Sequence, residues 1–167
     1  EFISIAAEAE RLLRELLELS RVGRVTNPPE RVSLDDLARE AIALLHGRLR
    51  AAHVRVEVQP GLGFVVGDRI RLLEVFQNLI ENAFTHGGAE VRVEVVVEPA
   101  GPIRVRDDGP GVPPEQLPGL IQRFRRGENG SKTGTGLGLA IVDTIMTKLG
   151  GRLELRSRAD GKERGFE

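Results

Sequence analysis

Residues 132–142 read Lys-Thr-Gly-Thr-Gly-Leu-Gly-Leu-Ala-Ile-Val, a glycine-rich loop that leads into an apolar helix. Three alternating glycines would destabilise an ordinary helix, so they indicate a phosphate or another close contact. Backbone N–H groups of such a loop, together with the helix N-terminus, form an anion site. The stretch is not a dinucleotide-binding fingerprint, which needs a preceding strand. It also lacks the Gly-Lys-Ser/Thr of a P-loop.

The segment before this loop is rich in cations, with Arg123, Arg125, Arg126 and Lys132. Guanidinium and ammonium groups neutralise phosphate oxygens, so this segment is a candidate for the phosphate end of the site. A solvated charged loop is the alternative interpretation. We expect one or two of these cations to contact the phosphates.

A helix predicted from Asp68 to about Thr85 carries two asparagines, Asn78 and Asn82, on one face, because they are four residues apart. Asparagine is a poor helix former, and a solvated face normally uses Lys, Glu or Gln. An amide oxygen is a neutral, hard ligand suited to a Mg²⁺ ion that also holds phosphates. The spacing is equally compatible with a structural hydrogen-bonding role.

Asp107 stands where a predicted buried strand runs into a turn containing Gly109 and Gly111. An ionised carboxylate only accepts hydrogen bonds. The exocyclic amine of adenine is a donor, whereas the corresponding group of guanine is an acceptor, so a carboxylate here selects adenine. The glycines let the backbone approach a flat base closely. A surface turn is the alternative, because Asp, Gly and Pro are common in turns.

The composition excludes several classes of function. The chain has 167 residues, a hydrophobic fraction of 40%, a charged fraction of 29% and a formal net charge of -1, so it has no polybasic character for nucleic acid. With no Cys, it has no disulfide or thiolate metal site, which fits a cytoplasmic protein. No apolar run is long enough to span a bilayer, so we expect no direct membrane contact by this fragment.

The remaining pattern predicts an α+β fold, a two-layer sandwich with helices on one face of a mixed sheet. The opening residues repeat apolar side chains with spacings of three and four, which predicts a helix that packs on a partner helix. Gly23 and Asn27-Pro28-Pro29 separate this helix from the globular part. Further elements are predicted as a helix over 34–49, strands over 54–58, 64–66, 91–97, 103–107 and 152–157, and a helix over 137–149. Ser33 is predicted to cap the helix over 34–49, and Asp68 to cap the helix that carries the two asparagines.

Taken in this order, the motifs resemble the ATP-binding catalytic domain of bacterial two-component sensor histidine kinases, in a superfamily with gyrase, the heat-shock chaperone ATPases and the mismatch-repair ATPases. Residues 78–83 resemble the N box, residues 107–111 the first glycine box, residues 123–126 the F box and residues 134–140 the second glycine box. Residues 16–21 resemble the end of the second helix of the dimerisation and phosphoacceptor domain.

The resemblance implies a histidine kinase ATPase fold that binds ATP and Mg²⁺. It implies that Asn82 ligates Mg²⁺, with Asn78 as a second candidate, and that Asp107 binds the adenine amine. The nucleotide-binding set that it implies is Asn78, Asn82, His86, Asp107, Gly109, Gly111, Arg125, Arg126, Lys132, Thr133, Gly134, Thr135, Gly136, Leu137 and Gly138. The segment from Arg125 to Thr133 would be the ATP lid.

The resemblance also implies a function and partners. Residues 1–26 would be a remnant of the dimerisation helix and linker, and residues 27–167 the catalytic domain, with its last strand truncated. The domain would donate the γ-phosphate of ATP to a histidine on the phosphoacceptor helices of the same protein, for relay to a response-regulator aspartate. The full-length protein would be a homodimer and a membrane-bound sensor, with this part in the cytoplasm and no nucleic acid bound. No catalytic residue is assigned.

Two departures from the family pattern keep alternatives open. Thr85 and His86 stand where the family often has a Lys or Arg followed by Tyr or His, and Ile121 replaces the first Phe of the F box. The phosphoacceptor helix is not in this sequence, so the fragment alone is not expected to autophosphorylate. One rival function is an ATP-gated conformational or dimerisation module, in which Glu81 could act as a base. Another is a degenerate nucleotide-binding scaffold.

Overall fold

The computed structural model describes residues 13, 17, 20, 27–86, 90–97, 101–121, 137–158 and 165–167. Its helices are α2 (Leu34–Ala51), α3 (Arg69–His86), the short α4 (Leu117–Leu120) and α5 (Gly138–Lys148), with a 3-10 turn, η1, at Pro114–Gln116. Its strands are β1 (Glu30–Ser33), β2 (Arg55–Val58), β3 (Phe64–Gly67), β4 (Arg92–Val97), β5 (Ile103–Asp107), β6 (Ser157–Arg158) and β7 (Gly165–Phe166).

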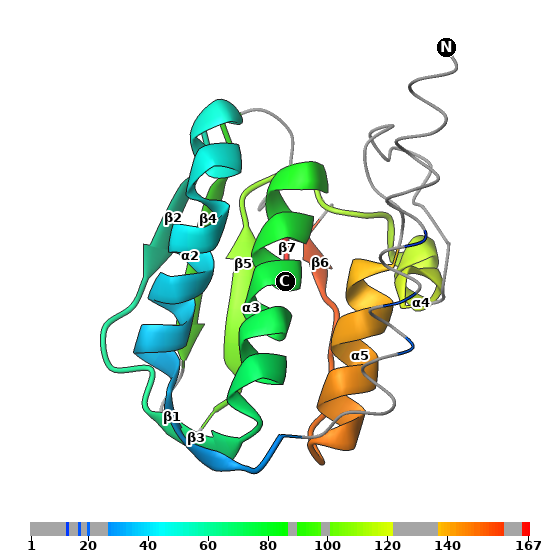
Figure 1. The fold of residues 1–167 in the computed structure, drawn as a ribbon. Helices are drawn as coiled ribbons and strands as arrows, with labels where there is room; N and C mark the ends of the chain where they lie inside the picture. The colour runs from blue at the N-terminus through cyan, green and yellow to red at the C-terminus, as the bar shows by residue number, and fades with distance from the viewer. Residues whose placement is uncertain are drawn as a thin grey trace.

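The five-stranded sheet has the order β2-β4-β5-β7-β6. The pair β2–β4 is parallel, and the pairs β4–β5, β5–β7 and β6–β7 are antiparallel. Helices α2, α3 and α5 lie side by side on one face of this sheet (Figure 1). A separate antiparallel pair, β1–β3, closes one end of the helical layer. The predicted α+β fold, with helices on one face of a mixed sheet, is therefore confirmed.

Local sequence signals explain where the helices begin. The hydroxyl of Ser33 accepts a hydrogen bond from the backbone N–H of Asp36 and so caps α2, as predicted. The carboxylate of Asp68 accepts hydrogen bonds from the N–H groups of Ile70 and Arg71 and caps α3. In both cases a side-chain oxygen satisfies a helix donor that has no partner inside the helix.

The core forms between the sheet and α3, the central helix. Val75, Phe76, Ile80 and Ala83 of α3 are buried. Phe76 and Ile80 pack in the main cluster with α2, the sheet and the β1–β3 pair. Val75 packs in a second cluster, formed with residues at the start of α5 and within it: Leu137, Ile141, Val142 and Ile145. Helix α3 is therefore covered both by the main cluster and by α5. A smaller part of its surface is open to a ligand than its single predicted apolar stripe indicates.

Several parts of the fold differ from the sequence prediction. Strand β1 and the segment η1–α4 carry weak periodicity and were not predicted. The strand predicted over 152–157 is wrong in extent: only Ser157–Arg158 forms a strand, and Arg156 exchanges two backbone hydrogen bonds with Glu167. Its partner β7 spans only two residues, so the ladder ends there. The predicted opening helix lies outside the described residues except for Leu13, Leu17 and Ser20, which are helical and exposed.

No helix among the described residues is both long and apolar enough to cross a bilayer.

Candidate nucleotide site

The candidate site lies where α3, the end of β5 and the start of α5 come together (Figure 1). Helix α3 contributes Asn78 and Asn82, strand β5 ends at Asp107, and α5 begins at Gly138. These residues come from three separate stretches of the sequence. The fold therefore brings the described parts of the N box and of the two glycine boxes to one region of the molecule.

Asp107 is half-buried at the end of β5. Its carboxylate accepts a hydrogen bond of 2.9 Å from the N–H of Gly109, inside the turn that follows the strand. Burial raises the pKa of Asp107 to about 6, and the negative charge of Asp108 adds to this, while backbone hydrogen bonds from Gly109 and Phe166 act in the opposite direction. The carboxylate is thus desolvated and keeps acceptor capacity for another donor.

The turn after Asp107 is held by its neighbours on both sides. The carboxylate of Asp108 accepts a hydrogen bond of 2.8 Å from the N–H of Arg92 in β4, and the N–H of Asp108 bonds back to the carbonyl of Arg92. Gly111 has a φ of 72°, which favours glycine, and Gly109 is buried. The predicted glycine turn is therefore held at the end of β5 by hydrogen bonds to the neighbouring strand β4.

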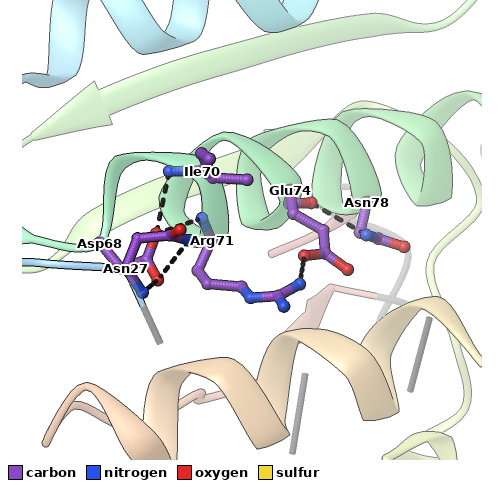
Figure 2. A network of polar contacts seen from close by, with 6 residues as sticks. All are labelled: Asn27, Asp68, Ile70, Arg71, Glu74 and Asn78. Carbon is purple, nitrogen blue, oxygen red and sulfur yellow. Dashed lines mark hydrogen bonds and ion pairs between the residues drawn. The ribbon is translucent and has the colours of Figure 1, made fainter. Parts of the chain in front are cut away.

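Asn78 faces the first turn of α5. Its amide Nδ2 donates a hydrogen bond of 2.9 Å to the backbone carbonyl of Glu74, one turn earlier in α3 (Figure 2). Its Oδ1 lies 3.2 Å from the position that a Cβ on Gly138 would occupy. Glycine at 138 therefore lets the two helices approach at this asparagine, which is the close contact that alternating glycines predict. Asn78 thus makes a structural hydrogen bond, and its predicted role toward Mg²⁺ stays a prediction.

Asn82 lies one turn further along α3 and is half-buried. Among the described residues, no group of three or more His, Cys, Asp or Glu side chains suits a metal ion. A Mg²⁺ ion held by a nucleotide needs only one or two protein oxygens, because phosphates and waters supply the rest. The amide oxygen of Asn82 suits that chemistry, whereas the amide of Asn78 donates to the carbonyl of Glu74 and its oxygen lies against Gly138.

Of the other predicted site residues, the structure describes His86 and Leu137. His86 ends α3 with an exposed side chain, although the chain around it desolvates the imidazole enough to lower its pKa. Leu137 is fully buried in the cluster between α3 and α5, so it serves packing. The remaining predicted contacts lie outside the described residues: Arg125, Arg126, Lys132, Thr133, Gly134, Thr135 and Gly136.

A polar network extends along α3 toward Asn78 (Figure 2). Asp68 accepts hydrogen bonds from the backbone and the side chain of Asn27, at distances of 2.8 to 3.1 Å. Arg71 pairs with Glu74 at 2.7 Å, and both side chains are largely buried. Sequence reasoning identified Asp68 as a helix cap but missed Asn27, because the two are 41 residues apart. This network stabilises the N-terminal end of α3, the helix that carries Asn78 and Asn82.

Comparison with known proteins identifies the family. Residues 67–167 match the family model described as "Histidine kinase-, DNA gyrase B-, and HSP90-like ATPase". The chain belongs to this ATPase family. Within the family, it is an ATP-binding catalytic domain of the sensor histidine kinase type, and the predicted resemblance is confirmed.

Two relatives and one solved complex illustrate the match to the histidine kinase-like ATPase family. The chain is 37% identical over 153 residues to the methanogenesis regulatory histidine kinase FilI of Methanothrix harundinacea, which covers 89% of this chain and 17% of FilI. The structure of the mycobacterial sensor histidine kinase MprB superposes with a TM-score of 0.73 at 27% identity, covering 82% of this chain and 93% of that one.

The third match is a histidine kinase, ThkA, solved in complex with the response regulator TrrA. It superposes with a TM-score of 0.76 at 21% identity, over 97% of this chain and 47% of that one, and supports the fold. The chain spans 17% to 35% of the length of the first three curated relatives that it matches. The domain is therefore compared with part of each longer relative.

Proposed function

We propose that this domain binds Mg-ATP and donates the γ-phosphate to a histidine on a phosphoacceptor helix of the same protein, for relay to an aspartate of a response regulator. The carrying observation is Asp107, a desolvated carboxylate at the end of β5 with acceptor capacity to spare. Such a carboxylate suits the exocyclic amine of adenine and rejects guanine. The family match and the named relatives, which are histidine kinases, support the proposal.

In this proposal each described residue has a separate task. Asp107 accepts the adenine amine, Asn82 holds Mg²⁺, and the N-terminus of α5 after the glycine loop faces the phosphates. Bound Mg²⁺ would neutralise charge on the phosphate oxygens. The imidazole nitrogen of the acceptor attacks the γ-phosphorus, the bond to the bridging oxygen breaks, and ADP leaves. The domain positions the donor and supplies no nucleophile.

Asn78 and Glu81 argue against the rival function of an ATP-hydrolysing module. A hydrolase needs a base on α3 that takes a proton from water. An amide at 78 cannot do so, and its Nδ2 already donates to the carbonyl of Glu74. Glu81 forms an ion pair of 2.6 Å with Arg48 of α2, so its carboxylate faces α2, on the side of α3 away from α5. Histidine phosphorylation is therefore the function favoured.

Nucleotide binding tests the site first. We expect Asp107→Asn to weaken ATP binding by roughly 100-fold or more, because the amide replaces an acceptor with a donor at the adenine amine. Calorimetry with ATP, ADP and GTP would measure this. Asp108→Asn is the matched control, since it is adjacent and exposed and still accepts the N–H of Arg92. Unchanged ATP affinity in Asp107→Asn would contradict the proposal.

Phosphoryl transfer tests the reaction. The domain is mixed with a separately produced phosphoacceptor helical domain of the same protein and labelled ATP. We expect an acid-labile label on histidine that requires Mg²⁺ and is lost with Asn82→Ala. Release of labelled phosphate without labelled histidine would instead support the ATP-gated module, and neither product would support a nucleotide-binding scaffold.

A further inference from the structure

Strand β7 contacts the candidate adenine-binding carboxylate from the far end of the sequence. Phe166 is the register partner of Asp107 in the β5–β7 pair. Gly165 has a φ of +141° and packs directly on the backbone of Asp107. A Cβ placed on Gly165 would lie 2.1 Å from the carbonyl oxygen of Asp107, a distance that real Cβ contacts do not reach. Both the backbone conformation and the space at 165 therefore require glycine.

The close approach also bears on the Asp107 carboxylate. The carboxylate accepts a hydrogen bond from the N–H of Gly109, which belongs to the turn just after β5. Backbone hydrogen bonding from Phe166 of β7, 59 residues away along the chain (166 − 107), lowers the pKa of Asp107 as Gly109 does. Both therefore favour the charged form that accepts a hydrogen bond.

The position of β7 is secured on its other side as well. Glu167 pairs with Arg104 of β5 at 2.9 Å, and both side chains are largely buried. The backbone of Glu167 exchanges hydrogen bonds of 2.7 and 2.8 Å with that of Arg156. Because β7 is held between β5 and the segment at Arg156, a side chain at 165 cannot be accommodated by a small local shift. It would separate β7 from Asp107.

We propose that Gly165 is a positioning residue for nucleotide binding: it allows β7 to pack so closely on the backbone of Asp107 that the end of β5 is held where its carboxylate meets the base. The inference rests on the proposed function, since it assigns Asp107 to the base. Gly165 itself contacts no nucleotide. Its effect on affinity passes through the position and ionisation of Asp107.

Gly165→Ala tests this inference, with Gly61→Ala as the matched control. Gly61 also has a positive φ, of +81°, but nothing lies within 4 Å of a Cβ there, so this variant carries backbone strain without a clash. Two quantities are measured: the titration of the Asp107 carboxyl carbon by NMR without nucleotide, and the ATP dissociation constant by calorimetry. A purely structural glycine would alter stability in both variants and neither quantity.

We expect the Asp107 titration midpoint to rise in Gly165→Ala, because a donor to the charged form is lost, and ATP affinity to fall by roughly tenfold. In Gly61→Ala both quantities should match the native protein. A Gly165→Ala protein with the native midpoint and the native ATP affinity would overturn the inference. Failure of the proposed function looks different: native protein would not bind ATP at all, while the NMR comparison would still report on Asp107.

A second variant covers the case in which Gly165→Ala does not fold. Phe166→Pro removes the N–H and leaves Gly165 in place. We expect the same rise in the Asp107 midpoint and the same loss of ATP affinity. A folded Phe166→Pro protein with a native Asp107 titration would show that the β7 N–H does not act on the carboxylate, and the inference would be wrong.

Discussion

Asp68 and Asp107 are two aspartates in similar places in the chain, the first directly after β3 and the second at the end of β5, yet the fold treats their charges in opposite ways. Asp68 is only 4% exposed, and burial alone would raise its pKa. Hydrogen bonds from Asn27, Arg71 and Ile70 outweigh burial, and the pKa of Asp68 is lowered. For Asp107 burial dominates, and its pKa rises to about 6.

The difference between the two carboxylates lies in how completely their oxygens are used. Asp68 accepts five hydrogen bonds, three from Asn27 and one each from Ile70 and Arg71 (Figure 2). For Asp107, the hydrogen bonds that lower the pKa come from the backbone of Gly109 and of Phe166. A carboxylate whose oxygens already accept several hydrogen bonds stabilises the fold. A desolvated carboxylate that can still accept a hydrogen bond is suited to a ligand. Asp68 is therefore a helix cap, and Asp107 has the unused acceptor capacity that the proposed adenine contact needs.

The largest effect on stability is expected from Asp68→Ala. The substitution removes the cap of α3 and leaves the Asn27 donors without their acceptor, so we expect a loss of about 2–4 kcal/mol in the free energy of unfolding. Urea denaturation followed by circular dichroism measures it. Asp36→Ala is the control, since Asp36 is exposed and forms a surface ion pair with Arg39. Equal losses in both variants would contradict a special role for Asp68.

Asp107→Asn should move stability in the other direction. Removing a desolvated charge relieves the folded state, so we expect the free energy of unfolding at pH 8 to rise by about 1–2 kcal/mol, less than the full pKa shift because the side chain is only half-buried. The same variant should lose ATP binding. Denaturation without nucleotide measures the gain. A destabilised Asp107→Asn protein would mean that the carboxylate stabilises the fold as Asp68 does.

The opposite pKa shifts of Asp68 and Asp107 should give opposite dependences of the folding stability on pH. The raised pKa of Asp107 makes its contribution most favourable below pH 3.8, and that contribution is lost as the pH rises through about 6. The lowered pKa of Asp68 makes its contribution present above 3.8 and lost as the pH falls through its folded pKa. The difference in stability between native protein and Asp107→Asn should change with pH between about 4 and 7, and the difference between native protein and Asp68→Asn should change below about pH 4. Matching pH windows for the two pairs would refute the contrast.

ATP affinity should change in the same pH range as the contribution of Asp107 to stability. Protonated Asp107 presents a donor to the adenine amine, so ATP affinity should fall as the pH drops through about 6. Calorimetry between pH 5 and 8 measures this fall. The part of this fall that Asp107 causes should be absent from Asp107→Asn.

The smallest effect is expected from Asn27→Ala. It removes the two side-chain hydrogen bonds to Asp68 and keeps the one from the backbone N–H at 27, so it should cost about 1 kcal/mol of unfolding free energy. The pKa of Asp68 should rise toward its ordinary value, which makes Asp68 more like Asp107. An NMR titration of Asp68 checks this. An unchanged pKa would show that the helix N–H groups alone hold the charge.

The candidate site was predicted from sequence only in part, and the reason differs from residue to residue. Asp107 and its glycine turn, Asn82 on α3 and Gly138 at α5 lie in local motifs whose residue types suit the chemistry. The role of Asn78 was left open, because its Oδ1 contact with Gly138 joins helices that are 60 residues apart (138 − 78). The contribution of β7 to the site was not predicted, because its pairing with Asp107 joins residues that are 59 positions apart (166 − 107).

The sequence by itself determined the motifs, the helix caps at Ser33 and Asp68, and the α+β class, because each depends on residues within a few positions of one another. Only the tertiary structure decided which carboxylate is saturated, that α5 packs on Asn78, and that Phe166 reaches Asp107. Ionisation and acceptor capacity depend on burial and on donors that arrive from distant segments. These are properties of the folded surroundings, so two aspartates that look alike in the chain acquire opposite roles.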